Sequence, residues 1–191
     1  MRELARVLLL RTLPHGARVS RLPHKPGDDL CTPPHVLDLV RAVGMIERDP
    51  FPCEHDNVRS RWSNPVDWDA FAPGADWSAE TAGTVSFSNP SYSRPNLPRF
   101  ADAWALQIWA PMTHGIALVP SSTGAVWFRK LCDHSQAVAF WHGRIAFWKD
   151  GKATKGGGLF DSALFYAGPR PHHFADVFAG AARVFLLGGN S

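Results

Sequence analysis

Cysteine is scarce in this 191-residue sequence, and Cys31, Cys53 and Cys132 are not close to one another along the chain. An odd number of cysteines without close pairs argues against a disulfide framework, so we expect free thiols and a reducing compartment. A histidine follows each cysteine within four residues, but the sequence has no Cys-x-x-Cys or His-x-x-x-His pair. Structural zinc sites usually show two such close pairs, so we expect no metal centre.

Long apolar runs are also missing. The longest one near the start, residues 7–10, is bracketed by Arg6 and Arg11. It falls far short of the roughly 20 apolar residues that a membrane-spanning helix needs. We therefore expect no transmembrane segment and no membrane partner.

Charged residues make up 19% of the chain and apolar residues 45%, which is typical of a globular protein. The formal net charge is +3, but residues 1–26 alone carry +5 and residues 27–191 carry −2. The basic excess therefore belongs to the N-terminus. We predict a basic flexible arm over residues 1–26, whose Arg-rich composition also resembles a transit peptide, and one domain over residues 27–191.

Hydrophobic periodicity in residues 27–191 predicts alternating helices and strands. Predicted helices cover residues 33–43, with Thr32 as a cap, residues 96–109, a segment starting after Ser122 or Thr123, and residues 173–180. Predicted strands cover residues 45–49, 84–88, 116–119, 137–141, 145–148, 163–166 and 182–187, with a mobile polar loop over residues 149–158. This order predicts an α/β sheet flanked by helices, with a β-rich C-terminal part. Ligands bind such sheets beyond the carboxyl ends of strands, which directs attention to the residues after Asp49 and Ser88.

The tetrapeptide Asn89-Pro90-Ser91-Tyr92 follows the predicted strand 84–88. Such residues form ordinary turns in many proteins. They also combine an amide acceptor, a rigid backbone carbonyl and an aromatic face, which suit the exocyclic amine of adenine. Asn89 and Pro90 would hold the amine and Tyr92 would stack on the base after it leaves the duplex.

With five further segments, this tetrapeptide resembles the phage-type Dam family of DNA N6-adenine methyltransferases, which carry Asn-Pro-Pro-Tyr. The matching segments are residues 27–33, 49–57, 119–128 and 143–148, and residues 163–168 close the match. The resemblance implies a Rossmann-like class I methyltransferase sheet and S-adenosylmethionine as cofactor. The cofactor-binding residues that it implies are Thr32, Pro33, Asp49, Pro50, Asn57 and either Asp69 or Asp67, with Asp69 favoured.

Two departures from the family pattern carry consequences. Ser91 replaces the second proline, which restores a backbone N–H and frees φ, so we expect slower chemistry. Phe51 and Pro52 stand where the usual glycine loop has small residues. Close backbone approach to the cofactor is then harder, so we expect weaker cofactor binding.

Basic residues near the C-terminal part are candidates for phosphate contacts. Arg144 either contacts a phosphate or anchors its turn to a carboxylate, and the sequence leaves both roles open. Lys149, Lys152 and Lys155 lie among glycines and form either a flexible phosphate clamp or a solvated hairpin tip. Another sequence feature is the set of tryptophans Trp62, Trp68 and Trp77, for which we favour core positions.

The resemblance implies a site-specific DNA methyltransferase that transfers a methyl group to N6 of a flipped adenine in double-stranded DNA. It places the protein in the cytoplasm of a bacterial host, phage-encoded or prophage-encoded, with restriction-modification among its roles. The alternatives are a weakened or inactive homologue that binds DNA, a cytosine-N4 methyltransferase, and a Trp-rich β module that binds sugar or protein. The oligomeric state stays open, with a monomer among the options.

Overall fold

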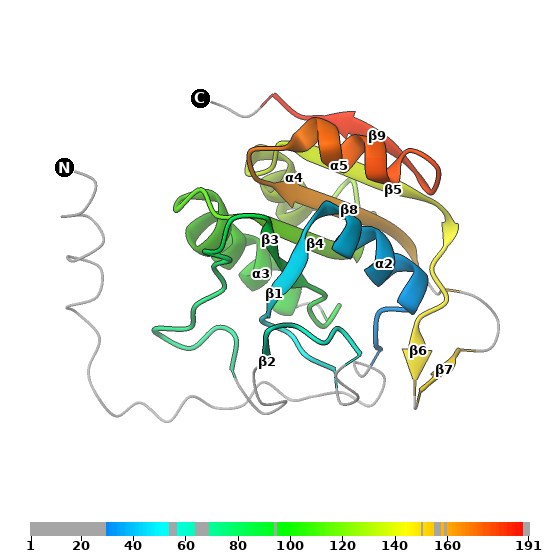
Figure 1. Cartoon of the computed structure of the whole chain (residues 1–191), viewed down its shortest axis with the longest axis horizontal. Coiled ribbons are helices and arrows are strands. Elements are labelled where there is room, and N and C mark those ends of the chain that lie inside the picture. The colour runs from blue at the N-terminus through cyan, green and yellow to red at the C-terminus, as the bar shows by residue number, and fades with distance from the viewer. Residues whose placement is uncertain are drawn as a thin grey trace.

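The computed structural model describes residues 30–53, 57–63, 69–93, 95–149, 151–154, 158 and 160–188. Its main feature is a seven-stranded sheet with the order β2-β1-β3-β4-β8-β5-β9 (Figure 1). The strands are β1 (Met45–Asp49), β2 (Trp62–Ser63), β3 (Thr84–Ser88), β4 (Gly115–Pro120), β5 (Ala137–Arg144), β8 (Asp161–Ala167) and β9 (Ala182–Leu186). The predicted arm, residues 1–26, lies outside the described residues.

The sheet is mixed. Strands β2, β1, β3 and β4 are parallel to one another, whereas β8 is antiparallel to both β4 and β5, and β9 is antiparallel to β5. Strand β2, the next strand along the chain after β1, lies on one side of β1, and β3 lies on the other side of β1. In open α/β sheets ligands bind beyond the carboxyl ends of the strands at such a reversal, which here lies next to the ends of β1 and β3.

Helices cover both faces of the sheet. On one face α2 (Pro34–Val43) packs against α5 (Pro171–Phe178), and on the other α3 (Asn96–Trp104) packs against α4 (Val126–Asp133). A π-helix, η1 (Ala105–Trp109), continues α3. The sequence-based prediction of an α/β sheet flanked by helices with a β-rich C-terminal part is confirmed at this level.

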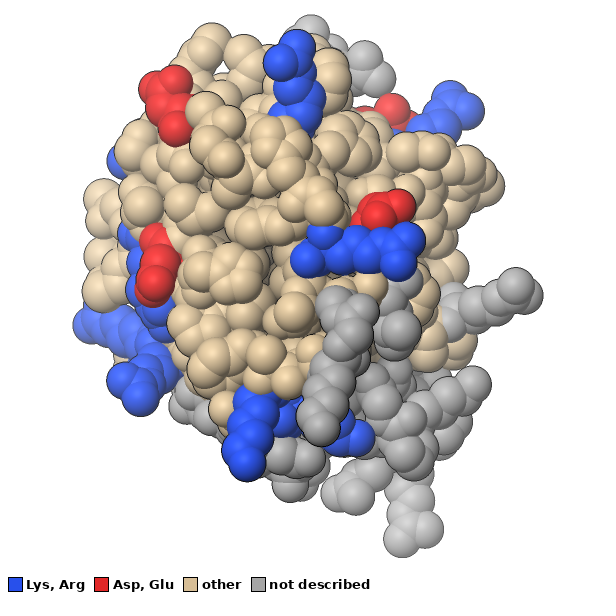
Figure 2. All heavy atoms as spheres, turned by 90° about the vertical axis from the view of Figure 1, so that its right-hand side faces the viewer, with Lys and Arg blue, Asp and Glu red and all other residues tan. Residues whose placement is uncertain are grey.

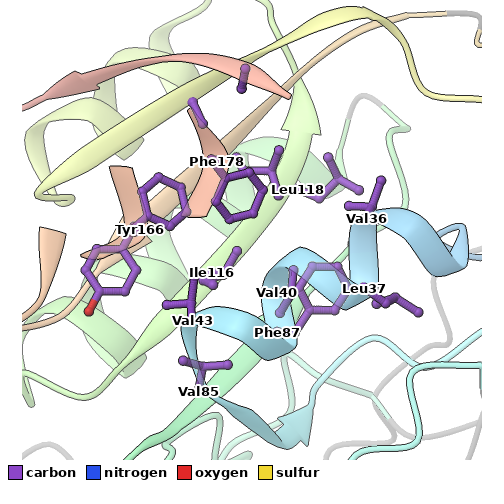
Figure 3. Close-up of a cluster of buried hydrophobic side chains, with 14 of the residues drawn as sticks. Val36, Leu37, Val40, Val43, Val85, Phe87, Ile116, Leu118, Tyr166 and Phe178 are labelled. Carbon is purple, nitrogen blue, oxygen red and sulfur yellow. The ribbon is translucent and has the colours of Figure 1, made fainter. Parts of the chain in front are cut away.

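The first core lies under α2 and α5 (Figure 3). Val36, Leu37, Val40 and Val43 recur at the spacing that places them on one side of α2, and all four are buried. In Figure 3 they lie near Ile116 and Leu118 of β4 together with aromatic rings from β8 and α5. Burial of each such side chain contributes about 1.5–3 kcal/mol, so this face fixes where α2 begins and ends against the sheet.

The second core lies under α3, η1 and α4. Leu97, Phe100, Trp104 and Ile108 are buried at the spacing that predicted a helix over residues 96–109. That helix is confirmed, although its last five residues are π-helical. Gly115 begins β4 directly beneath it, with no room for a side chain.

Three predictions about local structure are wrong. Thr32 does not cap α2, because the cap residue is Pro33 and no side chain bonds the helix end. Neither Ser122 nor Thr123 caps α4, because the cap residue there is Ala125, again without a side-chain bond. Residues 145–147 form no strand, and Trp148 belongs instead to a small hairpin, β6 (Trp148–Lys149) and β7 (Lys152–Ala153), which occupies part of the predicted loop 149–158. Ile145 is buried but pairs with no strand. Its apolar side chain therefore indicated burial correctly, but the strand that was predicted from it does not form.

The prediction of free thiols is also wrong for two of the cysteines. Cys31 and Cys53 form a disulfide with their Cα atoms 5.5 Å apart. The fold brings the segment before α2 beside the segment after β1, a proximity that a separation of 22 residues along the chain does not reveal. Cys132 is free, and burial raises the pKa of its thiol.

Candidate active site

The candidate site forms where strands β1 and β3 end side by side. The two strands are parallel neighbours, so Asp49 at the end of β1 and Asn89 just after β3 lie at the same edge of the sheet. A third segment, residues 30–32 ahead of α2, joins them through hydrogen bonds to Asn89. The sequence predicted all three segments as parts of one site, and the structure brings them together.

Asn89 is held by three hydrogen bonds. Its Nδ2 donates to the Leu30 carbonyl oxygen at 3.2 Å and to Thr32 Oγ1 at 3.1 Å. Because a carbonyl oxygen only accepts, the Leu30 contact requires the amide nitrogen to face this segment. The amide oxygen Oδ1 therefore points the other way, where it accepts a hydrogen bond from the Tyr92 hydroxyl at 2.9 Å.

Tyr92 lies between Asn89 and an aromatic pair. Its ring meets the rings of Phe147 and Phe160 edge to face, with centroids 6.0 and 6.1 Å away. Its hydroxyl also lies 3.4 Å from the Leu118 carbonyl oxygen, a longer contact than that to Asn89. Desolvation by burial raises the pKa of Tyr92, so the hydroxyl stays protonated and serves as a donor to Asn89.

Thr32 links Asn89 to the segment after β1. Its side chain is buried, its Oγ1 accepts from Asn89, and its backbone carbonyl accepts a hydrogen bond from Asn57 Nδ2. The Asn57 Oδ1 atom lies 3.2 Å from Cys53 Sγ, next to the disulfide. Thr32, Asn57, Asn89 and Tyr92 thus form one connected chain of contacts.

Asp49 and Pro50 lie at the carboxyl end of β1, and both are buried, as is Pro33 just before α2. Asp49 Oδ1 accepts a hydrogen bond from the Phe51 N–H at 3.0 Å, which shapes the turn that leaves β1. Such a turn places a carboxylate at the switch point of the sheet, where a ligand's amino or hydroxyl groups would meet it.

Phe51 lies in the turn after Asp49, where the resemblance implies a glycine loop. Its ring packs against Phe71, Trp77 and Phe100 at centroid distances of 5.5, 5.0 and 5.5 Å. The turn after Asp49 is therefore held by an aromatic cluster that belongs to the second core. The resemblance implied that small residues at this turn let a cofactor approach, and here an aromatic ring takes that place.

Asp69 repeats the geometry of Asp49. Its Oδ1 accepts a hydrogen bond from the Phe71 N–H at 2.9 Å, and Phe71 in turn contacts Phe51. The two carboxylates therefore stand on turns whose following residues share one aromatic cluster. The alternative residue Asp67 lies outside the described residues.

Pro90 is buried and Ser91 is partly exposed. The Ser91 Oγ lies 3.3 Å from Ser93 Oγ and accepts a hydrogen bond from the Ser93 N–H at 3.4 Å. The hydroxyl therefore closes the turn after Asn89 locally. It supplies part of the constraint that a proline ring would supply at this position.

The predicted DNA-contacting residues lie away from Asn89 along the chain, in and before the hairpin β6–β7. Arg144 Nε donates to Asp161 Oδ1 at 3.2 Å, so it occupies the carboxylate-anchoring one of its two open roles. Lys149 and Lys152 are paired in register across the hairpin and are exposed. Lys155 lies outside the described residues.

The hairpin is attached to the site through backbone hydrogen bonds. The Cys31 N–H donates to the Trp148 carbonyl at 2.8 Å, and the Trp148 N–H donates to the Cys31 carbonyl at 2.9 Å. The lysines on the hairpin are thereby tied to the segment that holds Asn89. In Figure 1 the hairpin lies at the lower right, beyond the main sheet.

Charge on the face that Figure 2 shows is scattered. Among the described residues in that view, Lys and Arg side chains form separate groups at the top, the left margin and the lower edge and in the right-hand half, where one lies next to an acidic side chain. Uncharged residues cover most of the rest. This face thus offers separate basic points instead of a continuous basic stripe.

The tryptophans that were predicted to lie in the core differ in their burial. Trp77 is fully buried, and its Nε1 donates to the Ala70 carbonyl at 2.8 Å, as a core position predicts. Trp62 in β2 is 55% exposed, which contradicts its predicted core position. It sits on the edge strand of the sheet, with the Arg61 guanidinium 5.9 Å from its ring centroid. Trp68 lies outside the described residues.

Sequence reasoning missed Leu30, Phe147 and Phe160 as parts of the site. Leu30 acts through its backbone carbonyl, which no residue type reveals. Phe147 belongs to the matched segment 143–148, so the resemblance was a usable indication for it. Phe160 comes just before β8, and nothing in its sequence context links it to Tyr92.

Among the described residues no group of three or more His, Cys, Asp or Glu side chains is placed to hold a metal ion. The helices of the described segments are all too short or too polar to cross a bilayer. No protein-family model, curated protein or solved structure matches the chain.

Proposed function

We propose that the protein is an S-adenosylmethionine-dependent methyltransferase that acts on N6 of adenine in double-stranded DNA. One observation carries the proposal: Asn89 is fixed at the carboxyl end of β3, with its oxygen directed toward Tyr92 and its nitrogen held by Leu30 and Thr32. A side-chain amide oriented in this way presents a fixed acceptor beside an aromatic ring.

The sheet supports a Rossmann-like, class I methyltransferase architecture for this site. Four neighbouring strands are parallel, and the chain reverses direction across the sheet at β1. The region beyond the carboxyl ends of β1 and β3 is the expected ligand position in such sheets. Asp49 and Asn89 stand on its two sides.

The residues on the β1 side fit S-adenosylmethionine by their chemistry. Asp49 and Asp69 supply carboxylates for the amino group and hydroxyls of the cofactor, and the partly exposed rings of Phe51 and Phe71 supply an aromatic surface. Asn57 lies at the same edge through its bond to Thr32. Bound there, the cofactor supplies an electrophilic methyl group.

The residues on the β3 side would hold the adenine amine. A carbonyl oxygen has two lone pairs, and Tyr92 uses one of those on Asn89 Oδ1, which leaves the second for an amine N–H. The Pro90 carbonyl would accept the other N–H. Holding both hydrogens fixes the direction of the nitrogen lone pair, and such positioning is a large share of catalysis in reactions between two bound groups.

The base must leave the duplex to reach this position, which costs a few kcal/mol of stacking and pairing. Stacking on an aromatic side chain returns roughly 1–3 kcal/mol per base. Tyr92, backed by Phe147 and Phe160, is the aromatic group beside Asn89. Lys149 and Lys152 on the attached hairpin, with Lys155 beyond it, would contact phosphates outside the site.

A transfer assay with labelled cofactor tests this proposal. Adenine-containing duplex DNA is incubated with the protein, with the Asn89→Ala variant, and with Ser122→Ala, a matched control at an exposed position after β4. We expect label in DNA from the parent protein and the control, and at least a hundredfold less from Asn89→Ala, as for loss of one fixed electrostatic donor or acceptor, about 10²–10³. Equal labelling by Asn89→Ala would contradict the assigned role.

A second candidate function is favoured by Phe51: a homologue that binds DNA without methylating it. The ring packs into the second core at the turn where cofactor would approach. Calorimetric titration with S-adenosylmethionine separates the two functions. Heat of binding supports the methyltransferase, whereas DNA binding without any cofactor heat supports the inactive homologue.

A further inference from the structure

Residues 30–32, here called the strap, hold Asn89 and are themselves held from two sides. On one side Cys31 is joined to Cys53 by the disulfide. On the other side the backbone of Cys31 pairs with Trp148 through two hydrogen bonds. The strap is therefore a short extended segment fixed at its middle residue.

The two acceptors of the Asn89 amide nitrogen belong to the residues on either side of Cys31. The Leu30 carbonyl precedes Cys31 and the Thr32 hydroxyl follows it, at 3.2 and 3.1 Å from Nδ2. The position of Cys31 therefore sets the positions of both acceptors. Since these acceptors determine which way the Asn89 oxygen points, the anchors of Cys31 act on Asn89.

The disulfide also fixes the segment after β1. Cys53 lies four residues before Asn57, and Asn57 donates to the Thr32 carbonyl. The covalent bond and this hydrogen bond thus join the same two segments at neighbouring points. Without the covalent bond, Asn57 and the Trp148 pairing would have to hold the strap alone.

We propose that the Cys31–Cys53 disulfide is a redox clip that positions Asn89, so that a dithiol reductant switches the site from a fixed to a loosened state. In the reaction a thiolate of the dithiol attacks one sulfur and the S–S bond breaks. The second thiol of the dithiol then attacks the dithiol's first sulfur and displaces the cysteine held in the mixed disulfide, so that the dithiol is oxidised to its disulfide and Cys31 and Cys53 each gain one electron and one proton.

Access favours attack at one of the two sulfurs. Cys31 is 4% exposed, whereas Cys53 is partly exposed. Exchange rates depend on access to the attacked sulfur, so the first mixed disulfide forms at Cys53. Trp148 still pairs with Cys31 after reduction, so the strap loses one anchor and keeps the other.

A thiol count tests whether the clip exists in the protein. The full chain is denatured without reductant and alkylated, and the modified cysteines are identified by mass spectrometry. We expect Cys132 alone to be alkylated in the protein as isolated under air, and all three cysteines after treatment with a dithiol. Alkylation of all three without reductant would overturn the proposal.

The Asn89 side-chain amide reports on the effect of the clip. Its 15N resonances are recorded for the oxidised protein, the reduced protein and the Cys31→Ser/Cys53→Ser variant, with Cys132→Ser as the matched control. We expect the oxidised protein and the control to show one protected amide. The reduced protein and the double variant should show a shifted, faster-exchanging amide that returns on reoxidation of the reduced protein.

The effect on catalysis rests on the proposed function. Below the unfolding transition of every sample, we expect reduction to lower kcat about tenfold, equivalent to about 1.4 kcal/mol. Unchanged Asn89 resonances, or an equal kcat in both redox states, would overturn the clip. If the resonances change but neither state transfers methyl groups, the clip stands and the methyltransferase assignment fails.

Discussion

Asn89 is the residue on which the site depends, and Thr32 is the side chain that holds it most specifically. Thr32 was predicted to lie near the cofactor and to cap α2, but its hydroxyl accepts from Asn89 instead. Its burial means that water cannot replace a lost hydroxyl at no cost. The hydroxyl is therefore a positioning group for the amide.

Replacing Thr32 with valine tests this role because valine keeps the shape and removes the hydroxyl. We expect Thr32→Val to lower kcat about tenfold, since one buried hydrogen bond of about 1–1.5 kcal/mol is lost. Thr32→Ser restores the hydroxyl and should recover most of the rate. Steady-state kinetics of the two variants are the measurement. An equal loss in both would mean that the methyl group, and not the hydroxyl, is what matters.

Glu47 is a buried carboxylate whose role is structural, in contrast to Thr32, which positions a residue of the candidate site. It lies in β1, two residues before Asp49, and accepts hydrogen bonds from the Thr81 N–H, the Thr81 hydroxyl and the Thr84 hydroxyl at 3.0, 2.6 and 2.7 Å. Burial acts to raise the pKa of Glu47, but these hydrogen bonds outweigh it and lower the pKa to about 2. The charged form is thus favoured by folding.

The pH dependence of stability follows from that direction. Because the folded pKa lies below the ordinary value of 4.5, the stabilisation is complete above about pH 4.5 and is lost as the pH falls toward 2. Glu47→Gln should cost about 1.5–3 kcal/mol at pH 7, as for hydrogen bonds to a charged group. Urea unfolding from pH 7 to pH 2.5 measures it. A difference between variant and parent that stays constant with pH would contradict the assignment.

At the scale of elements, the packing of α3 and η1 against β4 is a tight constraint. A Cβ at Gly115 would lie 2.6 Å from Ile108 Cγ2 and 2.8 Å from Trp104 Cη2, and both side chains are fully buried. Neither group can move into open space. The start of β4 therefore requires glycine because of the helix above it.

Gly115→Ala should destabilise the fold by about 1–3 kcal/mol, the usual cost of overpacking a core. Gly124→Ala is the matched control, because a Cβ there meets no atom within 4 Å. Thermal unfolding of both variants gives the comparison. Equal melting temperatures for the two would show that η1 and β4 are packed less closely than described.

The elements also show what the sequence could predict. Strands β1 and β3 have the predicted bounds. In β3, Val85 and Phe87 alternate with polar residues ahead of the turn-forming Asn89 and Pro90, which specifies this strand locally. The hairpin β6–β7 lies where the sequence left a solvated hairpin tip open as one of two interpretations, and Gly151, at φ 72°, lies in its turn. The disulfide and the Leu30 carbonyl depend on tertiary proximity, which no local pattern contains.

At the scale of the whole molecule, charge and chemistry are separated along the chain. Residues 1–26 carry +5 and residues 27–191 carry −2, although the candidate site lies entirely in the second part. Under the proposed function, the charge that would attract DNA and the groups that would recognise adenine are therefore in different parts of the sequence. Bulk charge gives salt-sensitive affinity, whereas Asn89 and Tyr92 would give the choice of base.

Deleting residues 1–26 tests this separation. We expect the slope of log binding constant against log salt concentration to become shallower, by roughly 0.9 for each DNA phosphate that these residues neutralise in the full chain. Calorimetric binding of S-adenosylmethionine should be unchanged, since Asp49, Asn57 and Asp69 remain. An unchanged salt slope would show that the N-terminal charges do not contact DNA.

The identity of the modified nucleoside tests the central claim most directly. Duplex DNA is incubated with the protein and S-adenosylmethionine, digested to nucleosides and analysed by mass spectrometry. The proposed function predicts N6-methyladenine as the product, absent when Asn89→Ala replaces the parent protein. N4-methylcytosine, or DNA that stays unmodified although the parent protein binds both the cofactor and DNA, would contradict it.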